Sequence, residues 1–255
     1  MSAKANDAEL TIWEHLEELR SRLLKAMIAL IVATMASVVF TKRALEILIA
    51  PLGEHVPQTI SPTESFLVYF RIALIGGLVL AMPVIVYQAI RFVLPGLLPH
   101  EQKYLYFLIP GATICFAGGV AFAALIMLPA AINFMQGFLS TIVDNRWTLD
   151  HYISFVTRVL FWMGVIFQTP LVMFFLAKLG LVTPKKLTRA RKYAVLATAI
   201  VAAVVTPTPD PINMMIVMLP LYLLYEVGII LARVATIGRK AKEEEQEGEE
   251  TAQAG

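Results

Sequence analysis

Two polar side chains lie inside long apolar runs of this sequence, Gln168 in FWMGVIFQTPLVMFF and Glu226 in LPLYLLYEVGIILA. Burying a polar group in such a run is costly unless the group is paired or faces water, so both residues are candidates for function. Gln168 lies two residues before Pro170, and a proline leaves a backbone carbonyl of the preceding turn without its donor. The amide can therefore hydrogen-bond across a helix interface or to a peptide that enters between the helices, and both interpretations remain open.

For Glu226 we favour a structural role over a role in catalysis or transport. It lies a few turns before the basic residues of the C-terminal tail, so it can snorkel to the membrane surface or pair with a cation such as Arg233. A secondary transporter of small solutes would need ionisable residues near the middle of the membrane, beside broken helices. Within the spans only Gln168, which is polar but not ionisable, and Glu226 remain as candidates, and this function is kept as the alternative.

The sequence has no residues with the spacing of a catalytic or metal-binding site. The histidines His15, His55, His100 and His151 fall in loops or surface segments, and the motifs HExxH and GxSxG are absent. The apolar runs contain no aspartate, so a paired-aspartate intramembrane protease is not indicated either. We expect no enzyme activity, no metal, no cofactor and no nucleic-acid partner.

The composition is that of an integral membrane protein. Hydrophobic residues make up 58% of the chain and charged residues 16%, with a mean hydropathy of +0.72, far from the balance of a soluble domain. A helix crosses the bilayer with about 20 apolar residues, and the sequence has candidate segments at approximately 23–40, 66–90, 104–134, 159–177, 193–205 and 212–232. The predicted fold is therefore an all-α membrane protein with six transmembrane helices.

The distribution of lysine and arginine predicts the orientation. Of the 21 such residues, 16 lie in the N-terminal segment, the second and fourth connections and the C-terminal tail. Cations accumulate on the cytoplasmic side, so both termini are expected in the cytoplasm. We expect a tail with an amphipathic helix at 1–25, a transmembrane domain at 23–235 and a disordered charged tail at 236–255. The N-terminus shows no removable signal peptide.

Other elements would shape these helices into a scaffold. The stretch LTIWEHLEELRSRLLK is amphipathic, with a pair between Glu18 and Arg22, and should turn into the membrane near Lys25. Residues 43–56 carry an apolar stripe interrupted at Pro51, which suggests a short outer helix. Prolines at the edge of or within four spans favour bent helices that form a concave wall: Pro83, Pro110, Pro129, Pro170 and Pro220.

The second and fourth spans share a spacing of arginine, glycine, proline and cation. The matching positions are Arg71, Gly77, Pro83 and Arg91 in the second span and Arg158, Gly164, Pro170 and Lys178 in the fourth. The two helices should run in the same direction, so a faint parallel repeat and a chance match are both possible.

Six motifs are spread from about residue 11 to 235: HLEELRSRLLK, IAPLG, MPVIVYQAIRFVLPGLLPHEQK, FQTPLV, VVTPTPD and LYEVG. Together they resemble the TatC family, the multi-spanning receptor of the twin-arginine protein translocase. The resemblance implies a glove-like concave scaffold of six helices in the bacterial inner membrane. It also implies that the chain binds twin-arginine signal peptides of folded cargo and exports that cargo with the single-span subunits TatA and TatB, driven by the protonmotive force. An assembly with several copies of the chain in contact with lipid is expected.

The resemblance also implies a signal-peptide site. Its residues would be Glu101 and Phe92 in the connection FVLPGLLPHEQKY, with Glu18 and Arg20 of the first helix. Carboxylates suit this role because paired guanidiniums bind them in forked geometry, while Arg20 would orient Glu18 or a neighbouring loop.

Three further positions match the family. Pro51 and Asp210 have roles that look structural or partner-related, and Asp210 would start the sixth helix. The family often has glutamate where this chain has Gln168, so a mechanism that needs a proton or a negative charge there is in doubt, whereas hydrogen bonding to a partner remains possible.

Overall fold

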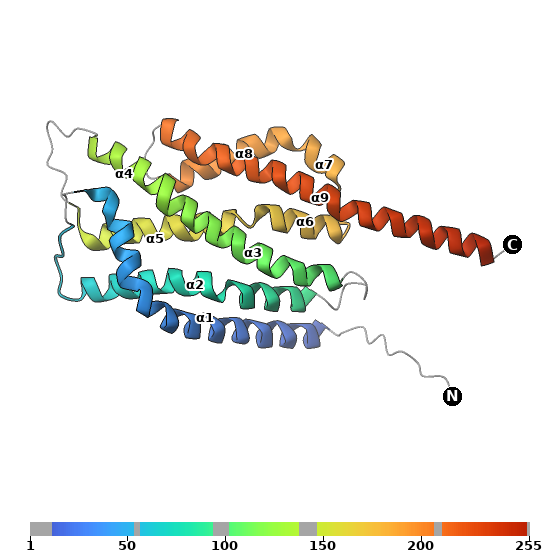
Figure 1. Cartoon of the computed structure of the whole chain (residues 1–255), viewed down its shortest axis with the longest axis horizontal. Helices are drawn as coiled ribbons and strands as arrows, with labels where there is room; N and C mark the ends of the chain where they lie inside the picture. The colour runs from blue at the N-terminus through green and yellow to red at the C-terminus, as the bar shows by residue number, and fades with distance from the viewer. Residues whose placement is uncertain (1–11, 54–56, 94–101, 138–146, 207–210, 254–255) are drawn as a thin grey trace.

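The computed structural model describes residues 12–53, 57–93, 102–137, 147–206 and 211–253 (Figure 1). These residues are mostly helical, and Gln58 and Thr148 add an isolated parallel bridge. The elements are α1 Ile12–Ile49, η1 Ala50–Leu52, α2 Glu64–Val93, α3 Gln102–Phe122, η3 Ala123–Met127, α4 Leu128–Gly137, α5 Leu149–Ile166, α6 Thr169–Lys178, α7 Pro184–Arg189, α8 Arg191–Val205 and α9 Pro211–Gln253.

The described residues contain five helical segments that are long and apolar enough to cross a membrane: Trp13–Leu52, Glu64–Phe92, Leu108–Gly137, Leu149–Lys178 and Met214–Thr236. The predicted all-α membrane fold is confirmed. The fifth predicted span corresponds to α8, which has 15 residues and would reach about 22 Å at 1.5 Å per residue. The count of six spans therefore stays a prediction.

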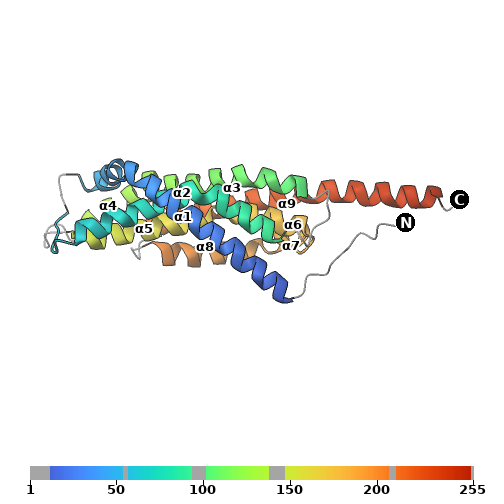
Figure 2. The ribbon, with the colours of Figure 1, turned by 90° about the horizontal axis from the view of Figure 1, so that it is seen from below.

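The first helix is longer than the sequence suggested. We expected a surface helix that turns near Lys25 and a separate short helix at 43–56, but α1 is unbroken from Ile12 to Ile49. Its sequence contains neither proline nor glycine, so nothing interrupts the hydrogen-bond ladder. Figure 1 shows the ribbon of α1 bending before its C-terminal end, and Figure 2 shows α1 crossing the other helices obliquely.

Pro51 and Gly53 end this helix. Pro51 lies in the first turn of η1, where a missing N–H costs little, and Gly53 has φ 62°. The Gly53 N–H donates to the Ala50 carbonyl oxygen at 3.1 Å. Pro51 thus lies where α1 ends, and its structural or partner-related role stays a prediction.

Pro170 breaks the predicted fourth span into two helices. α5 ends at Ile166 and α6 begins at Thr169, with Gln168 between them. The Gln168 carbonyl oxygen accepts the N–H groups of Leu171 and Val172, both at 3.0 Å. The ribbon of α6 continues in the general direction of α5 (Figure 1), so the pair acts as one interrupted span.

Small residues let the helices approach closely. A Cβ on Gly77 of α2 would lie 2.5 Å from the Thr34 Cα of α1, and one on Gly164 of α5 would lie 2.6 Å from the Phe116 ring of α3. The two glycines of the proposed repeat therefore share a packing role. Figure 1 shows α2 and the α5–α6 pair running in the same direction, as predicted.

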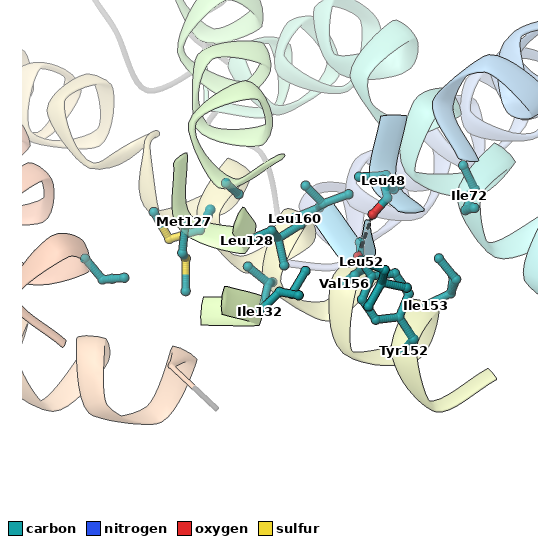
Figure 3. Packing of buried hydrophobic residues seen from close by; sticks show 14 of the residues in the cluster. Leu48, Leu52, Ile72, Met127, Leu128, Ile132, Tyr152, Ile153, Val156 and Leu160 are labelled. Carbon is teal, nitrogen blue, oxygen red and sulfur yellow. Dashed lines mark hydrogen bonds between the residues drawn. The ribbon is translucent and has the colours of Figure 1, made fainter. Parts of the chain in front are cut away.

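The core lies where α1, α2, α5 and the η3–α4 segment meet (Figure 3). Tyr152 is 1% exposed in this cluster, and its hydroxyl donates to the Leu48 carbonyl oxygen at 2.5 Å. This bond holds the end of α1 against α5 and satisfies a polar group that would be costly to leave unpaired among apolar side chains.

The C-terminal tail differs from the expectation in its local structure. Composition predicted disorder at 236–255, whereas α9 is helical as far as Gln253 and projects beyond the other helices (Figure 1), and the tail as a separate segment stays a prediction. The segment has no proline after Pro220 and is rich in alanine, lysine and glutamate, which favour helix. The start of α1 and the end of α9 point to the same end of the molecule.

Candidate functional site

The start of α1 packs against the last turn of α2 through an aromatic contact and a polar chain. The ring of His15 stacks on that of Phe92, with centroids 4.4 Å apart and planes inclined by 22°. Arg22 donates from Nη2 to Glu18 Oε1 at 2.9 Å and from Nη1 to Gln88 Oε1 at 3.4 Å. These contacts join residues more than 60 positions apart into one polar patch, which we call the α1–α2 patch: His15, Glu18, Arg22, Gln88 and Phe92.

The patch contains two of the four residues expected in the signal-peptide site. Glu18 and Phe92 both belong to it, while the side chain of Arg20 is exposed to solvent. Glu101 lies outside the described residues and immediately precedes α3 in the sequence. The predicted pair between Glu18 and Arg22 is present, and the Glu18 side chain remains 22% exposed.

Gln168 lies at the edge of an apolar groove between α2, α3 and α6. Its Nε2 donates to the Ala112 carbonyl oxygen of α3 at 2.9 Å, so it bonds across a helix interface, one of the two interpretations open from sequence. The groove has a volume of about 340 Å³ and is lined by Met82, Ile85, Val86, Ala89, Ile90, Leu108, Ala112, Gln168, Leu171, Val172 and Phe175. Among these lining residues Gln168 alone carries a polar side chain.

The last turns of α2 connect the groove with the patch. Ala89 and Ile90 line the groove, while Gln88 and Phe92 contact α1. An extended or helical apolar segment could therefore lie in the groove while a polar segment joined to it reaches the α1–α2 patch. This arrangement suits an amphiphilic peptide better than a compact solute, because the groove offers one polar side chain and no charge.

Glu226 has a different partner from the one expected. Its Oε2 accepts from Arg191 Nη2 at 2.7 Å and its Oε1 accepts from the Tyr222 hydroxyl at 2.9 Å. The prediction that Glu226 pairs with a cation is confirmed, but the cation is Arg191 at the start of α8 and not Arg233 of α9. The pair joins the start of α8 to α9, which fits the structural role favoured from sequence.

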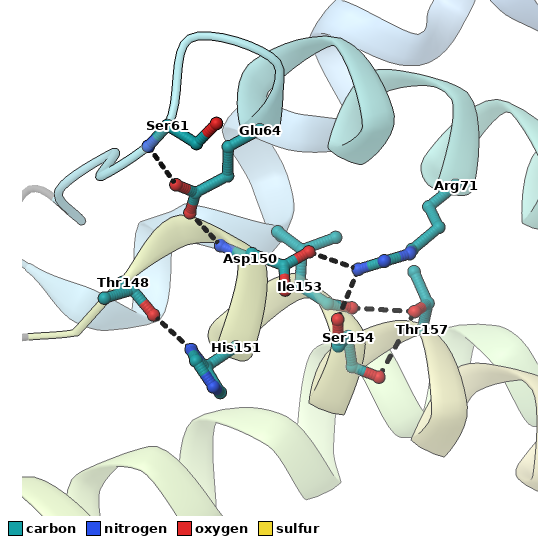
Figure 4. Close-up of polar contacts among 9 residues, drawn as sticks. All are labelled: Ser61, Glu64, Arg71, Thr148, Asp150, His151, Ile153, Ser154 and Thr157. Carbon is teal, nitrogen blue, oxygen red and sulfur yellow. Dashed lines mark hydrogen bonds and ion pairs between the residues drawn. The ribbon is translucent and has the colours of Figure 1, made fainter.

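A polar network at the other end of the bundle was missed by the sequence analysis (Figure 4). Arg71 Nη1 donates to Asp150 Oδ1 at 2.6 Å and also to the Ser154 hydroxyl. The Glu64 carboxylate accepts the Asp150 N–H at 2.5 Å and the Ile60 N–H at 2.8 Å. Glu64 thus caps the starts of α2 and α5 together, and its contact with an α5 N–H is favoured by the helix dipole.

Only Arg71 of this network had been singled out, as an arginine inside an apolar run. Its counterpart in the proposed repeat, Arg158, belongs to no such network among the described residues and has an exposed side chain that faces α8. The signal that was available was an acidic residue in the first turn of each of the two helices, Glu64 and Asp150. Asp210, expected to start the sixth helix, lies outside the described residues.

The fold and these sites define a polytopic helical membrane protein with an apolar intramembrane groove beside a polar surface patch. Comparison with known proteins gives the family. The family model of the Sec-independent protein translocase protein (TatC) matches residues 14–220. The chain therefore belongs to the TatC family, as the sequence motifs had indicated.

Curated relatives match most of the chain. The Sec-independent protein translocase protein TatC of Aquifex aeolicus is 36% identical over 92% of this chain and 98% of its own length. The TatC protein of Carboxydothermus hydrogenoformans is 36% identical over 89% of this chain and 94% of its own. The longer chloroplastic TATC of Pisum sativum is 33% identical, and the match spans 90% of this chain and 66% of the pea protein.

The fold matches solved structures as well. A crystal structure of a twin arginine translocase receptor, TatC, superposes with a TM-score of 0.72 at 36% identity, covering 88% of this chain and all of that one. A crystal structure of that receptor in DDM gives a TM-score of 0.74 at 35% identity over 86% of this chain. These matches favour a translocase over a small-solute transporter.

Proposed function

We propose that this chain is the receptor subunit of a twin-arginine translocase, which binds the signal peptides of folded proteins and takes part in their export. The observation that supports this best is the continuity between the α1–α2 patch and the apolar groove. A signal peptide presents a polar segment followed by an apolar one, and these two surfaces meet at the end of α2 in the corresponding order.

In this proposal the two arginines of the peptide bind Glu101 and Glu18, and the aromatic ring of Phe92 covers their stems. Forked hydrogen bonds between guanidinium and carboxylate select arginine over lysine. The carboxylates stand among many cations, which gives selectivity as well as attraction. Arg20 positions Glu18 or the adjoining connection.

The apolar segment of the peptide then lies along the groove toward Gln168. Because Gln168 is neutral, it would contribute hydrogen bonds to the peptide or a partner and would not exchange a proton. The Gln168 side chain donates to the Ala112 carbonyl oxygen. A carbonyl oxygen of the peptide or of a partner could replace that acceptor, so the same side chain can serve both helix packing and binding.

The wider setting is inferred with the same function. We propose six spans with both termini in the cytoplasm of a bacterium, assembly with TatA and TatB and with further copies of this chain, and transport driven by the protonmotive force. The common end reached by α1 and α9 supports an even number of crossings.

A photocrosslinking experiment tests the receptor site. A synthetic peptide with paired arginines and a photoreactive residue is added to proteoliposomes that contain the chain. Glu101→Ala should reduce crosslinking about tenfold, since a charge-assisted hydrogen bond contributes about 1.5–3 kcal/mol, and a peptide with lysines for arginines should crosslink weakly to the unaltered chain. Glu17→Ala, at an exposed glutamate of α1, is the matched control. Unchanged crosslinking to Glu101→Ala would refute the site.

A further inference from the structure

A second groove, between α5 and α8, lies apart from the proposed signal-peptide site. Its volume is about 490 Å³, and it is lined by Phe155, Arg158, Val159, Trp162, Ile166, Ile200, Val201, Val204 and Val205. Arg158 is the one ionisable residue among them. A guanidinium in such apolar surroundings is costly unless an anion or water meets it.

The backbone of Arg158 lies about one helical turn inside the hydrocarbon, close enough for its long side chain to reach the headgroups. The span Leu149–Lys178 has 30 residues, or about 45 Å of helix against about 30 Å of hydrocarbon, so several residues at each end lie in the headgroup region. Arg158 lies nine residues after the start of α5. Helical side chains lean toward the N-terminus of their helix, which directs its guanidinium back toward the headgroups at this end of the bundle.

Two arginines elsewhere in the described part of the chain have acidic partners. Arg71 pairs with Asp150 at 2.6 Å and Arg191 with Glu226 at 2.7 Å. No acidic side chain is among the residues that line the α5–α8 groove. The charge in this groove is therefore complementary to an anion that none of its described lining residues supplies.

We propose that the α5–α8 groove binds an anionic phospholipid, with its phosphate on Arg158 and an acyl chain along the apolar wall. A phosphate diester accepts the forked hydrogen bonds of guanidinium. The wall supplies no carboxylate for the ammonium group of a zwitterionic lipid, so a headgroup such as phosphatidylglycerol is preferred over phosphatidylcholine. Trp162 is 49% exposed and lines the same groove one helical turn after Arg158.

Trp162 also provides the readout. The full chain with Trp13→Phe and Trp147→Phe keeps it as the single tryptophan and is reconstituted in bilayers of phosphatidylcholine and phosphatidylglycerol. Quenching by brominated phosphatidylglycerol is compared with quenching by brominated phosphatidylcholine at equal mole fraction. We expect about a fivefold preference for the anionic lipid, the size given by one cation near an anionic headgroup.

Substitutions test whether Arg158 causes the preference for phosphatidylglycerol. Arg158→Gln should abolish the preference and Arg158→Lys should keep part of it, whereas Arg43→Gln, at an exposed cation outside the groove, should leave it unchanged. Native mass spectrometry of the chain with all three tryptophans, released from the same mixed bilayers, checks for retained phosphatidylglycerol. Equal quenching by both lipids would overturn the proposal, as would a preference that survives Arg158→Gln. Equal quenching is also the result expected if the groove instead binds a transmembrane helix of a partner that carries a carboxylate.

Discussion

At the scale of single residues, Gln168 shows how a polar group can be both structural and functional. Its side chain bonds to a carbonyl of α3 and its own carbonyl caps the start of α6. Glutamate at this position would have to find a cation or take up a proton, and no ionisable side chain is among the described residues that line the groove beside it. The amide avoids that cost and keeps the capacity to bond a partner.

We predict that Gln168→Leu impairs partner assembly or transport more than it impairs folding. The lost side-chain hydrogen bond is worth about 1 kcal/mol, and leucine suits the apolar groove, so expression and thermal stability should change little. Export of a folded reporter with a twin-arginine signal, in a strain that lacks its own receptor, measures the effect. Normal export by a well-expressed Gln168→Leu protein would contradict the prediction.

At the scale of elements, close helix contacts depend on glycine at a few sites. Gly77 is buried where α2 crosses α1, and a Cβ there would meet the Thr34 Cα at 2.5 Å and its backbone nitrogen at 2.7 Å. Backbone atoms cannot rotate away as a side chain can, so the helices themselves would have to separate. Which helices can touch therefore depends on where such glycines lie, and an apolar sequence pattern alone does not predict it.

Gly77→Ala should lower stability by about 1–3 kcal/mol, the usual cost of overpacking a core. Gly118→Ala is the matched control, because nothing lies within 4 Å of a Cβ at this helical glycine, and alanine should there be neutral or slightly stabilising. The unfolding midpoint of each purified variant in the same detergent makes the comparison. Equal midpoints for the two variants would show that α1 does not pack on α2 as described.

At the scale of the whole molecule, polar contacts gather at the two ends of the bundle. The network of Glu64, Arg71 and Asp150 holds one end, and the α1–α2 patch with the pair of Arg191 and Glu226 holds the other. Between them the described helices meet mostly through apolar side chains, with Gln168 at the break of the α5–α6 span. This division matches a scaffold whose ends lie in the headgroup regions on the two sides of a membrane.

The proposed orientation can be checked by labelling. In a Cys115→Ser background, a cysteine at exposed Thr59 should react with a membrane-impermeant maleimide in intact spheroplasts. A cysteine at exposed Lys185, at the opposite end of the bundle, should react only after the membrane is permeabilised. The reverse pattern would invert the topology, and equal labelling of both before permeabilisation would argue against any fixed orientation.

The membrane class, the helical fold, most span positions and the family could all be predicted from the amino-acid sequence. These depend on local composition and spacing, because a run of apolar residues must form a helix in lipid, and Pro51 or Pro170 interrupts a helix wherever it lies. The pairing of Glu18 with Arg22 was predictable for the same reason, because one helical turn separates them.

The contacts between distant groups required the three-dimensional arrangement of the helices. Arg71 and Asp150 are 79 residues apart, and Arg191 and Glu226 are 35 apart, so no spacing rule could pair them or tell Arg191 from Arg233. The groove beside Gln168 and the one beside Arg158 likewise depend on packing, since each is built by residues of separate helices. Helix formation is a local property of the chain in lipid, whereas partners and cavities follow from which helices pack together. Close-packing glycines and paired charges fix that choice over long distances.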